Sequence, residues 1–354
     1  MDKLNNLVDG YGRRLTYLRI SVTDRCNLRC VYCMPASGVS LMNHEDIISY
    51  EDILRLVRIL SRHGVNKVRI TGGEPLARKG LTDFVQKLSE IKDISDISMT
   101  TNGILLDKYA QSLFDAGLKR INVSLDSLNK EKFKRITRTG SLETVLKNIE
   151  LAKTIGYNPL KINTVLIRGI NDDEIIDFVN FARQFELDLR FIEYMPIGGN
   201  IADAVSSQEI EEKIKLKFDN FNPKKSKIKY NNNDDKALDE NVNDNKLSFY
   251  DGVSRVFGFD DNQAAIGFIS PMSEHFCGDC NRLRLTASGN MRLCLFYDNE
   301  YNIKDILKEK DDEIVFEKIS NIVKLKHFKH NFNEKAEKKG DMSSANDFMN
   351  AIGG

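Results

Sequence analysis

The sequence predicts an α/β fold of six β/α units, followed by a smaller α+β extension toward the C-terminus. From Leu15 to about Tyr194, short runs rich in Ile, Val and Leu alternate with amphipathic helical patterns. The apolar runs mostly lack polar alternation, as expected of strands that are covered on both faces. Past Asn220 the composition changes, and ordered patterns resume near Val253. An open doubly wound sheet and a barrel would both produce this pattern.

Six segments are predicted to be parallel strands that are joined by right-handed crossovers. They are Leu15–Val22, Lys67–Thr71, Ile97–Thr101, Arg120–Leu125, Lys161–Ile167 and Leu189–Glu193. The predicted helices between them are one that follows Ser49, then Leu81–Ile91, Leu106–Ala116, Leu142–Ile155 and Asp173–Phe185. Ser49 and Asp52 are placed for a capping box, which predicts the start of the first helix.

The C-terminal part is predicted to contain strands, a hairpin and two helices. The strands are Val253–Gly258 and Ala264–Ile269, and the hairpin pairs Phe276–Leu285 with Met291–Leu295 after a turn at Ala287–Asn290. The helices are Ile303–Lys308 and Glu313–Lys324, and His327 and His330 are interpreted as part of a solvated helix end. We expect residues 1–219 to form the β/α domain, 220–247 a low-complexity insertion or linker rich in Asn, Lys and Asp, and 248–354 the extension.

Composition and charge argue against several classes of protein. A hydrophobic content of 41% and a charged content of 29% place the 354-residue chain among ordinary globular proteins. Lys plus Arg and Asp plus Glu both number 52, so the overall charge gives no argument for a nucleic acid or a membrane as partner. No apolar run resembles a secretory signal or is long enough to span a bilayer, and we therefore expect a cytoplasmic protein.

The six cysteines fall into two groups of three, which suggests two metal sites. Cys26, Cys30 and Cys33 have the spacing C-x3-C-x2-C directly after the first predicted strand. Thiolates are the preferred ligands of iron–sulfur clusters, and a cubane cluster held by three cysteines leaves one iron open to a small molecule. A zinc site would need a fourth ligand, and the nearest candidate, His44, lies eleven residues further on. Three buried thiols without a metal are the remaining alternative.

The second group, Cys277, Cys280 and Cys294, has the spacing C-x2-C-x13-C. The predicted hairpin brings Cys294 back toward Cys280, so the three thiols are expected to form one metal site. The alternative is a zinc site in which His275 is the fourth ligand.

Basic residues collect in or beside strands that are otherwise apolar. They are Arg19, Lys67, Arg69, Lys161 and Arg190. Because an unpaired buried charge is strongly disfavoured, a polyanionic ligand at the carboxyl ends of the strands would explain their position. Small polar residues at the strand ends suit a nucleoside-like ligand. Two neighbouring features have simpler alternatives, since Gly72-Gly73 is also typical of a plain turn and Met195 of core packing.

The first cysteine motif, with Tyr32 before its last cysteine, resembles the signature of the radical S-adenosylmethionine (SAM) superfamily. The whole chain resembles the GTP 3′,8-cyclase family, also called the molybdenum cofactor biosynthesis protein A family. The matching motifs are Leu18–Cys26, Arg69–Pro75, Thr100–Gly103, Arg120–Asp126, Gly169–Asp172, Arg190–Glu193, Phe276–Arg284 and Ile352–Gly354. The chief departure is the Asn-rich segment before Val253.

The resemblance implies a partial (β/α)6 TIM-like barrel with two [4Fe–4S] clusters. Cys26, Cys30 and Cys33 would hold the cluster that binds SAM, and Cys277, Cys280 and Cys294 the cluster that binds the substrate. The residues implied to contact SAM are Tyr32, Gly73, Ser124 and Met195. Those implied to contact GTP are Arg19, Arg69, Thr100, Lys161, Arg282 and Arg284, with Lys67 and Arg190 as additional phosphate contacts. The Gly353-Gly354 tail would enter the active site and assist turnover, whereas a frayed terminus is its ordinary alternative.

The implied reaction converts GTP to (8S)-3′,8-cyclo-7,8-dihydroguanosine 5′-triphosphate in molybdenum cofactor biosynthesis. A 5′-deoxyadenosyl radical derived from SAM would abstract the 3′ hydrogen of the ribose, and no side chain is nominated as a general acid or base. The implied partners are a reductant protein, a downstream cyclic pyranopterin monophosphate synthase and a second copy of the chain in a homodimer. The alternatives are a radical SAM enzyme that modifies a peptide or an RNA, and a non-catalytic metal-binding protein.

Overall fold

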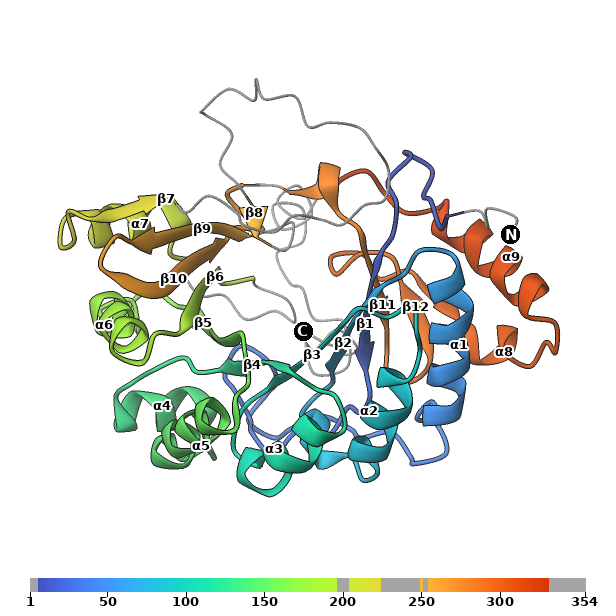
Figure 1. The fold of residues 1–354 in the computed structure, drawn as a ribbon, viewed down its shortest axis with the longest axis horizontal. Helices are drawn as coiled ribbons and strands as arrows, with labels where there is room; N and C mark the ends of the chain where they lie inside the picture. Colours follow the sequence, from blue (N-terminus) through green and yellow to red (C-terminus); the bar gives the residue numbers. More distant parts are fainter. Residues whose placement is uncertain (1–5, 196–203, 224–248, 251–253, 275, 331–354) are drawn as a thin grey trace.

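The computed structural model describes residues 6–195, 204–223, 249–250, 254–274 and 276–330. Within these residues, 13 strands form one sheet that curves around the centre of the molecule (Figure 1). The strand order is β13-β12-β11-β1-β2-β3-β4-β5-β6-β10-β9-β7, and β8 pairs with β9. None of the described helices combines the length and the apolar composition that crossing a membrane requires.

The first six strands are neighbours in space in the same order as in the sequence. They are β1 (Tyr17–Ser21), β2 (Lys67–Thr71), β3 (Asp96–Thr101), β4 (Arg120–Ser124), β5 (Leu160–Leu166) and β6 (Asp188–Glu193). Each neighbouring pair is parallel, as predicted. All six lie within two residues of their predicted bounds, because each is a buried apolar run between polar segments.

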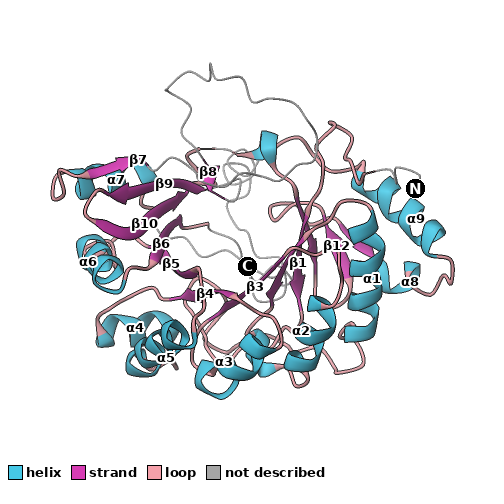
Figure 2. Cartoon of the chain, viewed as in Figure 1, coloured by secondary structure: helices cyan, strands magenta, loops and turns pink. Residues whose placement is uncertain are grey.

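The connecting helices are α1 (Tyr50–Arg62), α2 (Leu81–Ser89), α3 (Leu106–Asp115), α4 (Lys130–Thr137), α5 (Leu142–Ile155) and α6 (Ile175–Phe185). They lie on the outer side of the curved sheet (Figure 2). A doubly wound sheet would carry helices on both faces, so these units form a partial (β/α)6 barrel.

Helix α1 shows how the local sequence produces these elements. The Ser49 hydroxyl oxygen accepts a hydrogen bond from the Asp52 N–H at 3.0 Å, and the same hydroxyl donates to the Asp52 carboxylate at 2.7 Å. This is the predicted start of the helix. Ile53, Leu56 and Val57 are 0% exposed on the face that packs against the sheet. Burial of each such side chain stabilises the fold by about 1.5–3 kcal/mol.

The structure adds two helices that the apolar periodicity does not predict. Helix α4 has the sequence KEKFKRIT and buries only Phe133, Ile136 and Thr137, so its helical pattern is weak. Its start is specified instead by Asn129, whose side-chain oxygen accepts hydrogen bonds from two N–H groups of the first turn. Helix α7 (Ser207–Lys215) is amphipathic but short, and Ser206 caps it in the same way.

The C-terminal part of the chain extends the sheet at both ends. The predicted pair of strands forms β9 (Ser254–Phe259) and β10 (Asn262–Ile269), and β10 pairs parallel to β6. The predicted hairpin forms β11 (Arg282–Leu285) and β12 (Asn290–Arg292), and β11 pairs parallel to β1. The short strands β7 (Phe221–Pro223), β8 (Phe249–Tyr250) and β13 (Glu300–Asn302) pair at the edges.

Two further helices complete the described chain. They are α8 (Ile303–Ile306) and α9 (Asp312–Val323), close to the predicted bounds. Helix α9 lies beside α1, where the ring of Phe316 stacks on His63 with 3.3 Å between ring centroids. Most of the predicted insertion at 220–247 lies outside the described residues.

Candidate active site

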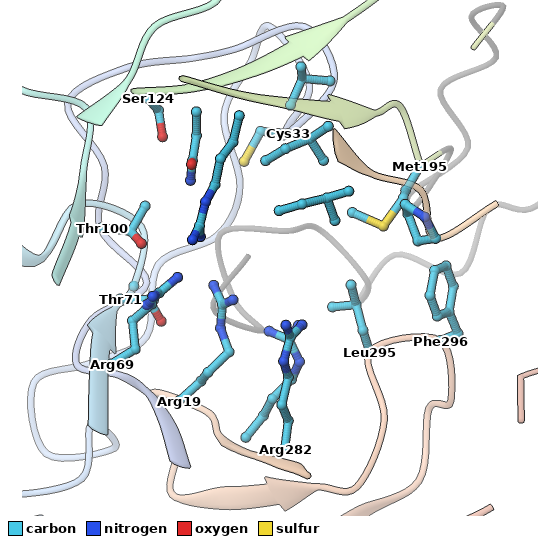
Figure 3. A pocket seen from close by; sticks show the side chains of 18 of the residues that line it. Arg19, Cys33, Arg69, Thr71, Thr100, Ser124, Met195, Arg282, Leu295 and Phe296 are labelled. Carbon is cyan, nitrogen blue, oxygen red and sulfur yellow. The ribbon is translucent and has the colours of Figure 1, made fainter. Parts of the chain in front are cut away.

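A cavity of about 300 Å³ lies at the carboxyl ends of the barrel strands, where active sites of such barrels are found. All six cysteines line it, although most of the chain separates the two triads in sequence. Figure 3 shows Arg19, Arg69 and Arg282 extending into the same part of the cavity, across from Cys33 and Met195. The predicted groups are therefore brought together in one place.

The first triad lies on the loop that follows β1. The Cys33 N–H donates to the Cys30 carbonyl at 3.0 Å, and the Asn102 amide lies 3.8 Å from the Cys26 sulfur. Burial raises the pKa of Cys26, and it raises the pKa of Cys30 further because Asp126, Cys33 and Cys26 add to the effect. Three mutually close thiols beside an amide donor fit a cluster, since iron stabilises the thiolates that burial disfavours.

Gly72 and Gly73 pack against the backbone of this cysteine loop. A Cβ atom on Gly73 would lie 2.4 Å from the carbonyl oxygen of Arg25, and one on Gly72 would lie 2.7 Å from that of Thr23. The Gly73 N–H donates to the Thr23 carbonyl at 2.7 Å. Any side chain at Gly73 would push the loop away directly before Cys26, so close approach of two backbones explains the glycine pair.

Two buried glutamates connect the loops around the cavity. Glu74 accepts hydrogen bonds from the Leu76 N–H at 3.1 Å, the Thr101 hydroxyl at 2.8 Å and the Asn102 N–H at 2.7 Å. Burial raises the pKa of this carboxyl to about 7. Glu74 therefore joins the end of β2 to the end of β3.

Glu193, at the end of β6, has the same role on the other side. Its carboxylate accepts from the N–H groups of Met272 and Ser273, both at 3.0 Å, and from the Ser207 N–H at 3.2 Å. The Ser273 hydroxyl also donates to it. One buried carboxylate thus holds the start of α7 and the segment that leads to the second triad.

A tyrosine of the cysteine motif contacts the barrel. The Tyr32 hydroxyl donates to the Asp126 carboxylate at 2.7 Å, and the Val165 N–H donates to the other oxygen at 2.9 Å. Burial raises the pKa of Asp126 to about 6, and it raises the pKa of Tyr32 well above its ordinary value. This contact fixes the last part of the cysteine loop over β4 and β5.

Arginines form a row across three neighbouring strands. Arg19 on β1 is in register with Arg284 on β11 and with Arg69 on β2. Burial lowers the pKa of Arg284 to about 10, and the Arg282 guanidinium adds to this effect. Like charges directly opposite each other destabilise a sheet, so this row fits a polyanionic ligand.

The second triad lines the same cavity as the first. Cys277 and Cys280 lie on a short 3-10 turn, Cys277–Asp279, and Cys294 follows β12. Burial raises the pKa of Cys277. Burial also acts to raise that of Cys280, but the charges of Lys326 and Arg282 outweigh it and lower the pKa. A positively charged surrounding suits three thiolate ligands.

Several buried polar atoms at the cavity lack a hydrogen-bond partner within the described part of the chain. They include Thr100 Oγ1, Asn163 Oδ1 and Arg282 Nε. Because most buried polar groups in proteins are hydrogen bonded, these atoms indicate a polar ligand.

Comparison with known proteins identifies the family. Residues 20–182 match the model of the radical SAM superfamily, and residues 233–332 match the model described as Molybdenum Cofactor Synthesis C. The GTP 3′,8-cyclase of Thermodesulfovibrio yellowstonii is 46% identical over 85% of this chain and 88% of its own length. That of Petrotoga mobilis is 43% identical over 92% of this chain and 95% of its own. The chain belongs to the GTP 3′,8-cyclase family.

Solved structures agree on the fold of this family member. Streptococcus suis SuiB bound to S-adenosylmethionine superimposes with a TM-score of 0.61 over 88% of this chain and 68% of that chain. The two sequences are 15% identical, so the likeness concerns the fold alone. Together with the family models, it confirms the predicted α/β fold and the partial barrel. Membership of the superfamily also implies a [4Fe–4S] cluster and SAM as cofactor.

In this GTP 3′,8-cyclase family member, most predicted site residues line the cavity. They are the six cysteines, the SAM group Tyr32, Gly73, Ser124 and Met195, and the anion group Arg19, Arg69, Thr100, Arg190, Arg282 and Arg284. Lys67 and Lys161 do not line it. Both lie near the amino ends of their strands, whereas the cavity is at the carboxyl ends, and the Lys161 ammonium lies 3.6 Å from the Asp188 carboxylate. Gly353 and Gly354 lie outside the described residues.

The interpretation of His330 as a solvated residue is wrong. His330 is 7% exposed, lines the cavity and stacks on Phe296 with 4.1 Å between ring centroids. His327 is exposed, as predicted, but stacks on Tyr297. Neither contact is visible in the sequence, because both depend on where the chain runs after α9.

Two further cavity residues, Asn163 and Lys326, were not predicted. Asn163 could have been predicted from its position two residues after Lys161 on the same strand, because alternate residues of a strand share a face. Within the described part of the chain, no three His, Cys, Asp or Glu side chains are arranged to hold a single metal ion. A cluster differs in this respect, because each cysteine binds a different iron.

Proposed function

We propose that this chain converts GTP to (8S)-3′,8-cyclo-7,8-dihydroguanosine 5′-triphosphate in molybdenum cofactor biosynthesis. The observation that supports this most directly is one cavity lined by two cysteine triads and by Arg19, Arg69, Arg190, Arg282 and Arg284. The triads supply ligands for clusters, and the arginines supply charge for a triphosphate.

On this proposal Cys26, Cys30 and Cys33 hold a [4Fe–4S] cluster, and Tyr32, Gly73, Ser124 and Met195 contact SAM. The bound cluster and SAM supply the one-electron chemistry that produces a hydrogen-abstracting radical. The chain's own part is to position this loop. Gly72 and Gly73 allow it to lie against β2, and the Tyr32 hydroxyl holds it to Asp126.

The GTP triphosphate is proposed to bind the arginine row with Thr100. Arg19, Arg69 and Arg284 come from three adjacent strands, so their guanidinium groups are already in place before the ligand arrives. Lys161, predicted in the same group, lies deeper in the barrel, and it and Lys67 would act through the electrostatic field. The guanine is proposed to face Cys277, Cys280 and Cys294, which would hold the second [4Fe–4S] cluster.

The remaining proposals concern partners and the tail. The enzyme would take electrons from a reductant protein and pass its product to a cyclic pyranopterin monophosphate synthase, and it would form a homodimer. Cytoplasmic location fits cysteines that must stay reduced to bind iron. The Gly353-Gly354 tail is proposed to assist turnover, and deletion of both glycines should lower kcat.

Incubation of the anaerobically reconstituted protein with SAM, a reductant and GTP tests this function. We expect 5′-deoxyadenosine and a cyclised nucleotide to form together, and neither to form at the same rate with ATP. Formation of 5′-deoxyadenosine that does not depend on GTP would contradict the proposed substrate and favour the alternative of a peptide or RNA substrate.

A further inference from the structure

Lys326 is a buried lysine beside the second cysteine triad. Its side chain lines the cavity, and the residue is only 3% exposed. Its ammonium donates a hydrogen bond to the carbonyl oxygen of Leu293, the residue directly before Cys294. Within the described residues it forms no ion pair with a carboxylate, unlike Arg13 or Arg255. A buried ammonium of this kind needs a negative partner.

The position of Lys326 is fixed by its surroundings. The Lys326 N–H donates to the Val323 carbonyl at 3.0 Å, so the residue continues directly from α9. Further along, His327 stacks on Tyr297, and the Tyr297 hydroxyl donates to the Lys329 carbonyl at 3.1 Å. The segment after α9 is therefore held along the loop that carries Cys294.

Arg282 adds a further positive charge near Cys280, and two other arginines, Arg13 and Arg292, contact the backbone of this region in a different way from Lys326. The Arg13 guanidinium donates to the Cys277 carbonyl at 2.5 Å, but it is also paired with the buried Asp9 carboxylate at 2.6 Å. The Arg292 guanidinium donates to the Tyr297 carbonyl at 2.7 Å and lies 3.4 Å from Asp298. Arg13 and Arg292 therefore form ion pairs with carboxylates. Lys326 forms no such ion pair within the described residues.

The negative partner that the site offers is the cluster itself. Three thiolates on an iron–sulfur cluster give the site a net negative charge, and reduction by one electron makes it more negative. A positive charge in a water-poor site stabilises the reduced state more than the oxidised state. The hydrogen bond to Leu293 would also hold the backbone next to Cys294 in place.

We propose that Lys326 is a positioning residue and counter-ion of the second cluster, and that its charge makes this cluster easier to reduce. The inference rests on the proposed second cluster at Cys277, Cys280 and Cys294. It differs from a role in substrate binding, since it concerns the cluster in the absence of GTP.

The test measures the reduction potential of the second cluster in the full-length reconstituted protein without GTP. The signal of this cluster is the part of the electron paramagnetic resonance spectrum that is absent from Cys294→Ser. Lys326→Gln keeps an N–H donor but removes the charge, Lys326→Met removes both, and Lys326→Arg keeps both. Lys324→Met is the matched control, because Lys324 is exposed on the same segment.

We expect a lower potential in Lys326→Gln and Lys326→Met, and wild-type potentials in Lys326→Arg and Lys324→Met. Lys326→Met should also retain less iron, falling from about eight toward about four atoms per chain as the second cluster is lost. If Lys326→Met loses the second cluster entirely, its potential cannot be measured. The potential of Lys326→Gln then tests whether the charge of Lys326 affects the cluster.

Equal potentials in wild type, Lys326→Gln and Lys326→Arg would overturn the inference and leave the proposed function intact. A higher KM for GTP in Lys326→Gln at unchanged potential would overturn it as well, and would make Lys326 a substrate contact. Failure of the wild-type protein to bind a second cluster would instead overturn the proposed function, and this inference with it.

Discussion

Arg19 lies directly beside Arg284, in register on two parallel strands that are far apart in the sequence. Burial and the Arg284 guanidinium lower the pKa of Arg19 well below its ordinary value. Arg69 lies in register on its other side, so Arg19 has an arginine beside it on each neighbouring strand. We expect the arrangement to favour anion binding at the expense of the stability of the ligand-free protein.

Replacement of Arg19 by Met should separate these two effects. We expect the ligand-free protein to become more stable, by several tenths of a kcal/mol to about 1 kcal/mol, because a repelled charge is removed and the apolar stem is kept. GTP binding should weaken by about 2 kcal/mol or more, roughly thirtyfold in Kd. Chemical denaturation and isothermal titration with GTP measure the two quantities.

The matched control is Arg135→Met on the exposed side of α4, which should change neither quantity. Loss of stability in Arg19→Met together with unchanged GTP affinity would show that the arginine row is structural.

An inorganic anion should relieve the same repulsion. We expect tripolyphosphate at 100 times its Kd to stabilise the protein by about 2.7 kcal/mol, seen as a higher Tm in differential scanning calorimetry. The increase should be smaller in Arg19→Met and at high salt, because screening weakens charge interactions. An equal increase with a neutral sugar at the same concentration would contradict a specific anion site.

Gly73→Ala should displace the first cysteine loop. The added methyl group would overlap the Arg25 carbonyl, so the backbone must move directly before Cys26. We expect a loss of about 1–3 kcal/mol of stability and a lower iron content after reconstitution. Gly278→Ala is the control, because a Cβ at Gly278 would meet nothing within 4 Å. Equal iron content in the two variants would show that the close approach at Gly73 is dispensable.

Glu193→Gln should loosen the C-terminal extension. The amide offers one oxygen where the carboxylate offers two, and its NH2 group would face N–H donors of Ser207 or of Met272 and Ser273. We expect a loss of about 1–3 kcal/mol in urea denaturation and faster hydrogen exchange at residues 270–274. The exposed Glu212→Gln should stay within about 0.5 kcal/mol of wild type. Unchanged exchange in Glu193→Gln would contradict the proposed connection.

The sequence was sufficient to predict the barrel strands because each is a local apolar run. The bounds of β2, Lys67–Thr71, were predicted without error. Helix α4 was missed because its charged residues leave little apolar periodicity. The pairing of β11 with β1 could not be predicted either, since it joins segments whose patterns are independent of each other.

The site residues differ in the same way: some are recognisable from the sequence around them, and others reach the site only through contacts with distant segments. The cysteines and most arginines carry their own signal, because their residue types and spacing suit clusters and phosphate. Lys161 was assigned to the right strand, but the depth of the cavity along that strand is set by the loops above it. Lys326 carries no local signal at all, because it reaches the second triad only through the packing of α9 against α1.

The pairing of β1 with β11 also determines when the sheet can be completed during synthesis of the chain. Thr16 and Asn281, which hydrogen bond at 2.8 Å beside this pairing, are 265 residues apart. During synthesis β1 and its neighbours can form well before β11 leaves the ribosome, so one edge of β1 stays open through most of translation. An open strand edge of this kind can pair with other chains. The first cysteine triad also leaves the ribosome long before the second, so the first cluster and the proposed second cluster could be loaded at different times.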